Sequence, residues 1–140
     1  MLFRSRSEDG LTLLGSTQAI LNGAALQPPM PGAATSIGVV ATDAVISKVQ
    51  ANKMAQMAHD GLARSINPVH TLGDGDTLFV LGTGASGLAV HTTVLGTLAA
   101  EVVARAVLNA VRAARSISGP GLPTLPCVND FSFGALTPSP

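Results

Sequence analysis

The feature that most restricts the fold of this chain is an alternation of strand-like and helix-like apolar patterns between residues 35 and 115. The run SIGVVATD is short, apolar and rich in β-branched residues, which is typical of a strand that is buried on both faces. The run TLFVLGT predicts a second strand, and a helical pattern follows each of the two. The order strand, helix, strand, helix predicts a mixed α/β (α+β) fold.

The two helical patterns differ in how much of their surface is apolar. In residues 47–66 the apolar side chains recur near helical spacing, Ser47 is a suitable N-cap, and Pro68 stops the pattern. In residues 91–115 they cover more than half of the helix surface, so we expect this second helix to be deeply buried.

Changes in composition divide the chain into three parts. Residues 1–34 are expected to be a short leader that ends in the Pro/Gly linker QPPMPGAA, and LTLLGSTQAIL within it is compatible with either a strand or a short helix. Residues 35–115 are the expected core. Residues 116–140 hold five of the nine prolines, which predicts an irregular tail.

Charge and composition exclude several classes of partner. Eight basic and eight acidic side chains balance, and Trp and Tyr are absent, so we expect no nucleic-acid partner. Cys127 is the only cysteine, which excludes an intrachain disulfide and favours an inert thiol. The first ten residues lack the apolar core of a signal peptide, so we expect a cytoplasmic protein.

The uncharged stretch between Asp76 and Glu101 is long enough to span a bilayer. It is nevertheless rich in Gly, Thr and Ser and contains His91, so its hydrophobicity is modest for a spanning helix. A strand, a glycine turn and the start of a buried helix explain it better. We therefore expect no membrane span here.

The segment GTGASG, Gly82 to Gly87, matches the G-x-G-x-x-G pattern of dinucleotide-binding folds. The acidic residue of that fingerprint should end a second strand, whereas Glu101 lies inside a helical pattern, so a structural glycine turn is favoured over a nucleotide site. The histidines are separated by eleven and twenty-one residues, unlike a helical zinc motif. We expect neither a metal nor an organic cofactor.

One constellation could carry chemistry. Thr35 follows the Pro/Gly segment and precedes the first strand, and GDGD places Asp74 and Asp76 on a tight turn before the second strand. If the two strands are neighbours, their starts could lie at the same edge of the sheet. A Thr hydroxyl becomes nucleophilic when an adjacent base, such as its own freed α-amine, takes its proton. The alternative is a polar turn without catalytic function.

The segments TSIGVVATDA, AQMAHDGLARSINPVHT and DGDTLFVLGTG resemble the C-terminal part of the P1 family of peptidases. That family includes DmpA-like D-aminopeptidases, β-peptidyl aminopeptidases and nylon-oligomer hydrolases. The resemblance implies an N-terminal-nucleophile hydrolase with an αββα layered sandwich, which cleaves its own precursor before the nucleophile. The nucleophile falls on Thr35, and the family's later acidic residues fall on Asp74 and Asp76.

The resemblance also implies substrates and partners. Family members act on short peptides or amides with a free amino end, use no metal or organic cofactor, and assemble as oligomers of αβ units. This chain corresponds to the β-subunit, with Ala34 where the family usually has Asn. We expect it to form a homo-oligomer or to need an α-subunit-like chain that supplies a Lys or Tyr and an Asn. The alternative is a non-catalytic family member that acts as an assembly module.

Overall fold

The computed structural model describes residues 12–13, 15–23 and 35–133, which belong to two compact units. The described part of the first unit runs from residue 35 to residue 108. The second comprises residues 12–13, 15–23 and 109–133. Each unit is described by itself.

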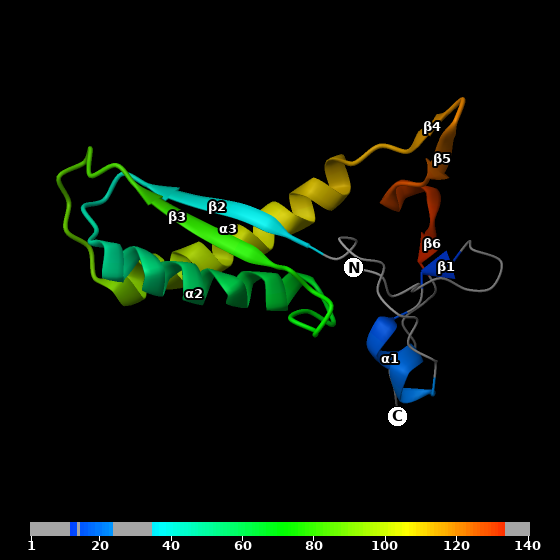
Figure 1. Ribbon diagram of the computed structural model, residues 1–140, viewed down its shortest axis with the longest axis horizontal. Coiled ribbons are helices and arrows are strands. Elements are labelled where there is room, and N and C mark those ends of the chain that lie inside the picture. Colours follow the sequence, from blue (N-terminus) through cyan, green and yellow to red (C-terminus); the bar gives the residue numbers. More distant parts are fainter. Residues whose placement is uncertain (1–11, 14, 24–34, 134–140) are drawn as a thin grey trace. The chain divides into compact units, whose positions relative to one another are not determined.

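The first unit contains a strand–helix–strand motif followed by a long helix (Figure 1). Strands β2 and β3 are parallel neighbours, with Ile37 opposite Thr77 and Thr42 opposite Gly82. This register confirms that both strands start at the same edge. The bounds of the four elements are β2 (Ile37–Thr42), α2 (Lys48–Ser65), β3 (Thr77–Gly82) and α3 (Thr92–Ala113).

Helix α2 begins and ends where the sequence predicted. The Ser47 hydroxyl accepts a hydrogen bond from the Gln50 N–H at 3.3 Å, and the Gln50 side chain accepts one from the Ser47 N–H at 2.9 Å. This reciprocal capping box satisfies two N–H groups that would otherwise lack intrahelical partners. The helix ends at Ser65, shortly before Pro68.

The core lies between one face of the two-stranded sheet and the two helices. It joins buried side chains of both strands, α2 and α3: Val40, Leu78, Met54, Ala58, Leu62, Ala99 and Val103. The helices approach closely at Gly61, where an added Cβ would lie 2.3 Å from the Ala100 carbonyl oxygen. Glu101 of α3 also contacts Arg64 of α2, with 3.9 Å between the charged atoms.

The prediction that the first strand, β2, is buried on both faces is wrong within this unit. Along each strand, alternate side chains turn away from α2 and α3, and Val39 and Phe79 on that outer face are 65% and 55% exposed. Ile37 and Leu81 extend the same face and are exposed as well. We call these four side chains the outer sheet face.

The predicted deep burial of α3 is also wrong. Only its side that carries Gly96, Ala99, Ala100 and Val103 is buried, because two strands and one helix offer too little surface to enclose it. The stretch between Asp76 and Glu101 divides into β3, a turn and the start of α3. By length and composition α3 could cross a bilayer, and 22% of its most apolar window is buried, whereas Glu101 pairs with Arg105 midway along it.

The second unit consists of short elements. Strand β1 (Thr12–Leu13) pairs in parallel with β6 (Ser132–Phe133), and α1 (Ser16–Leu21) follows β1. Where an irregular tail was expected, β4 (Ile117–Gly119) and β5 (Leu122–Leu125) form an antiparallel pair, followed by a 3₁₀ turn at Val128–Asp130. Gly121 has a φ angle of 76°, which allows the chain to reverse tightly between β4 and β5. The prolines nearby had favoured the prediction of an irregular tail.

Candidate active site

The loop between α2 and β3 is shaped by Asp74. Its Oδ2 accepts a hydrogen bond from the Thr71 N–H at 2.7 Å, and its own N–H donates to the Thr71 carbonyl at 3.0 Å. These two bonds close a tight turn of the kind that Asp side chains stabilise. The polar turn expected for GDGD is therefore present, and Asp74 has one carboxylate oxygen engaged in it.

Asp76 ties the start of β3 to the start of β2. Its Oδ1 accepts a hydrogen bond from the Ser36 N–H at 2.9 Å, and the Ser36 carbonyl accepts one from the Thr77 N–H at 2.8 Å. The Asp76 side chain is only 7% exposed, so this bond is shielded from competing water. Ser36 is consequently hydrogen-bonded through both its N–H and its carbonyl. This also fixes the position of Thr35, the residue before it.

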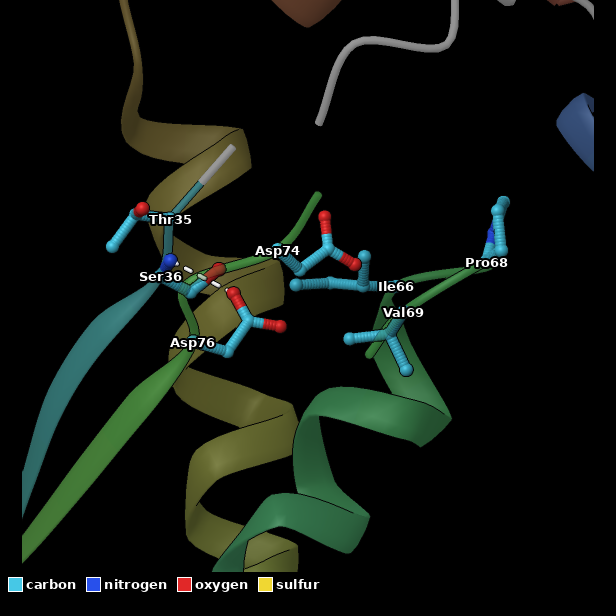
Figure 2. Close-up of a pocket in the computed structure, with 7 residues that line it drawn as sticks. All are labelled: Thr35, Ser36, Ile66, Pro68, Val69, Asp74 and Asp76. Carbon is cyan, nitrogen blue, oxygen red and sulfur yellow. Dashed lines mark hydrogen bonds between the residues drawn. The ribbon is translucent and has the colours of Figure 1, made fainter. Parts of the chain in front are cut away.

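Thr35 lies directly against the turn. A Cβ added at Gly75 would stand 2.8 Å from Thr35 Oγ1, so the hydroxyl occupies the space that a side chain between the two aspartates would need. Figure 2 shows the Thr35 side chain and the Asp74 carboxyl group pointing in different directions. The structure thus brings Thr35, Asp74 and Asp76 to one edge of the sheet, as the sequence predicted, with Gly75 as the direct neighbour of the hydroxyl.

A small hollow lies beside these residues (Figure 2). Its lining combines Thr35, Ser36 and the two carboxylates with apolar side chains from the end of α2 and the following loop: Ile66, Pro68 and Val69. Its cavity volume is about 30 Å³, enough for a water-sized group. Ligand pockets generally measure ~300–1,000 Å³, so this hollow can hold only part of a peptide.

His70 is the residue at this edge that the sequence did not single out. Its Nδ1 lies 3.5 Å from Asp76 Oδ2, and its ring contacts the ring of His59 on α2 with 5.1 Å between centroids. Histidine spacing along the chain could not reveal this, because a loop brings His70 to the carboxylate. Within the described ranges, no three His, Cys, Asp or Glu side chains are grouped as metal ligands would be.

The GTGASG segment forms a turn beyond the opposite, carboxyl-terminal end of β3. Gly84 and Gly87 have φ angles of 69° and 67°, and the Gly87 N–H donates to the Gly84 carbonyl at 3.1 Å. The Ser86 hydroxyl donates to the Asp43 carbonyl at 2.9 Å, which ties this turn to the end of β2. Each feature fits the structural glycine turn that the sequence favoured.

Comparison with known proteins gives a class consistent with this geometry. An uncharacterized aminopeptidase of Mycobacterium leprae is 42% identical over 132 residues, and one of Mycobacterium tuberculosis is 41% identical over 114 residues. The 6-aminohexanoate-oligomer endohydrolase of a Kocuria species is 36% identical over 97 residues. These relatives are named as enzymes that hydrolyse peptide or amide bonds.

Residues 6–123 match Peptidase family S58, and the chain belongs to that family. This membership confirms the resemblance seen in the motifs. The matches cover 85%, 72% and 61% of this chain for the three relatives, but only 36%, 33% and 27% of the relatives themselves. The chain therefore spans about a third or less of the length of these curated relatives.

Proposed function

We propose that this chain carries the nucleophile of an aminopeptidase or amidohydrolase that acts on short peptides or amides with a free amino end. The observation that carries the proposal is the position of Thr35, with its hydroxyl against Gly75 and its neighbour Ser36 tied to Asp76. Cleavage of the Ala34–Thr35 bond frees the Thr35 α-amine. That amine then lies on the residue whose hydroxyl it must deprotonate.

The proposed reaction runs through an acyl-enzyme. Thr35 Oγ1 attacks the substrate carbonyl while the α-amine takes the hydroxyl proton, and the proton passes to the departing amine. Water then attacks the ester, which releases the acyl group as a carboxylic acid and restores the Thr35 hydroxyl. An α-amine has a pKa of about 7.7–8.0, so a useful fraction is neutral near pH 7. Asp76 holds Ser36 and with it Thr35, and Asp74 shapes the adjoining turn, so the two carboxylates position the nucleophile.

We further propose that the first unit is one half of an αββα sandwich. Among the residues that the structure describes, the two-stranded sheet has helices on one face only, and its outer sheet face is apolar and exposed. A second sheet laid on that face would bury it, as in sheet-on-sheet packing. The curated relatives have about two thirds of their length outside the match, which is enough chain to supply such a layer and the rest of the substrate pocket.

Intact-mass measurement tests the self-cleavage. A purified protein that loses the residues before Thr35, beside a Thr35→Ala variant that keeps them, supports the proposal. Hydrolysis of aminoacyl p-nitroanilides and of 6-aminohexanoate oligomers by the cleaved form then gives the substrate class. A Thr35→Ala variant that is still cleaved at that bond, or that hydrolyses amides as fast as the unsubstituted protein, contradicts it.

A second candidate function is favoured by the outer sheet face alone. A family member without catalytic activity would still need a partner for that surface, because exposed contiguous apolar patches mark interaction sites. This assembly function predicts that the protein binds a partner through β2 and β3, stays uncleaved, and shows no amidase activity in the complex.

A further inference from the structure

The two oxygens of the Asp76 carboxylate have different partners. Oδ1 accepts the Ser36 N–H at 2.9 Å, and Oδ2 lies 3.5 Å from His70 Nδ1. Because the side chain is 7% exposed, little water is available to replace either partner. A buried carboxylate needs such partners to satisfy its oxygens and to stay fixed in direction. Removal of one partner therefore leaves the carboxylate free to turn away from the other.

His70 is set in place by its backbone conformation. Its φ angle is 57°, in the left-handed region. Within the described ranges, His70 is the only residue other than glycine with a positive φ. Such a conformation is disfavoured for a side-chain-bearing residue and often marks functional sites. The ring also contacts the ring of His59 on α2, with an angle of 53° between the two planes.

We propose that His70 is a positioning residue of this site. Its Nδ1–H directs Asp76 Oδ2 so that Oδ1 stays on the Ser36 N–H, and Thr35 thereby stays on Gly75. This rests on the proposed role of Thr35 as the nucleophile. Both the neutral Nδ1–H tautomer and the imidazolium can donate this contact, so the role does not require a particular charge on His70.

The titratable groups around His70 agree with this role. His59 faces the ring from α2, and Asp76 faces it from the start of β3. Asp74, in the same loop, has Oδ2 engaged by the Thr71 N–H and shapes the turn. The separation of 3.5 Å is long for a hydrogen bond, and catalytic hydrogen bonds are often this long until substrate tightens them.

The test compares three single variants of the 140-residue chain. His70→Gly removes the ring, and glycine adopts a positive φ without strain. Asp76→Asn replaces the carboxylate that links His70 to the Ser36 N–H with a weaker, uncharged acceptor. His59→Gln removes the ring contact on α2 but leaves the His70–Asp76 pair. Hydrogen exchange of the Ser36 amide, followed by NMR, reports directly on the bond that His70 is proposed to hold, whether or not the chain is active.

We expect Ser36 amide exchange to be about tenfold faster in His70→Gly and in Asp76→Asn, and within about twofold of the unsubstituted chain in His59→Gln. Added imidazole, which can enter the half-exposed space left by the ring, should restore slow exchange in His70→Gly alone. Unchanged exchange in His70→Gly, or acceleration as large in His59→Gln, overturns the proposal.

Thr35-dependent hydrolysis by the whole protein gives the second readout. We expect kcat to fall about tenfold in His70→Gly and to recover with imidazole, since small displacements of a nucleophile slow reactions at this scale. Faster exchange with unchanged kcat overturns the role in the reaction. If the unsubstituted protein hydrolyses nothing, the proposed function fails, and the exchange data still decide whether His70 holds Asp76.

Discussion

At the scale of single residues, a methyl group added at Gly75 would lie 2.8 Å from Thr35 Oγ1. We expect Gly75→Ala to displace Thr35 and to slow self-cleavage and hydrolysis by about 10²-fold, because an error of about 1 Å at a reacting group costs that much. Stability should change little, since Gly75 is exposed in the loop before β3. Cleavage rate by intact mass and kcat on an aminoacyl p-nitroanilide measure the effect.

Gly73→Ala is the matched control for this prediction. Gly73 lies two residues earlier in the same loop, is exposed, and is outside the left-handed region. It should keep at least about half of the unsubstituted rate, because surface substitutions without a specific contact have small effects. Equal losses in the two variants would show that the loop is merely sensitive to added methyl groups.

A pH effect is expected at Asp130 in the second unit. The Ser116 hydroxyl, and next the Cys127 N–H at 2.9 Å, donate to its Oδ2 and lower the pKa of this carboxyl below 3.8. A lowered folded-state pKa adds stability above the unfolded value, and this is lost as pH falls through the folded value. On acidification below pH 3.8, the Cys127 amide resonance should therefore shift in the unsubstituted chain but not in Asp130→Asn. A shift shared by both would contradict this.

At the scale of elements, the contact between α2 and α3 depends on Gly61. A Cβ there meets the Ala100 backbone oxygen at 2.3 Å and the Val103 Cβ at 2.7 Å, and backbone cannot rotate away. Gly61→Ala should therefore lower the free energy of unfolding by about 1–3 kcal/mol, despite the better helix propensity of Ala. Urea unfolding followed by circular dichroism measures it.

Gly96→Ala is the matched comparison on α3. Its added Cβ meets the sulfur and terminal methyl of Met57, which are the far end of a flexible side chain. The gain of about 1 kcal/mol in helix propensity should then offset most of the repacking cost. If Gly96→Ala is the more destabilising of the two, the proposed difference between backbone and side-chain contacts is wrong.

The elements also show how far sequence patterns reach. Apolar spacing and the Ser47 cap placed β2, α2 and β3 within a residue or so, since these signals are local. The sequence also predicted that, if the two strands were neighbours, their starts could lie at the same edge of the sheet. The prediction that α3 is deeply buried was wrong, because periodicity shows that a helix surface is apolar but does not show which elements cover it. The contacts of Ser36 and His70 depend on strand register and on a loop dihedral angle, which residue spacing does not encode.

At the scale of the whole molecule, Leu78 and Phe79 are neighbours on β3 with opposite environments. Leu78 is buried in the core, whereas Phe79 belongs to the outer sheet face and is exposed. Phe79→Lys should therefore change the stability of this chain by less than about 0.5 kcal/mol. Leu78→Ala should lower it by about 2–5 kcal/mol, because it leaves a cavity.

Assembly should show the reverse order of effects. If a second layer covers the outer sheet face, Phe79→Lys buries an unpaired charge there and prevents the complex, because a desolvated charge costs several kcal/mol. Size-exclusion chromatography after co-expression with the part of the M. leprae aminopeptidase outside the match tests this. Retention of the complex by Phe79→Lys would show that the partner does not bind the outer sheet face. The rest of the substrate pocket around Thr35 would then have to be supplied by chain that packs elsewhere on this unit.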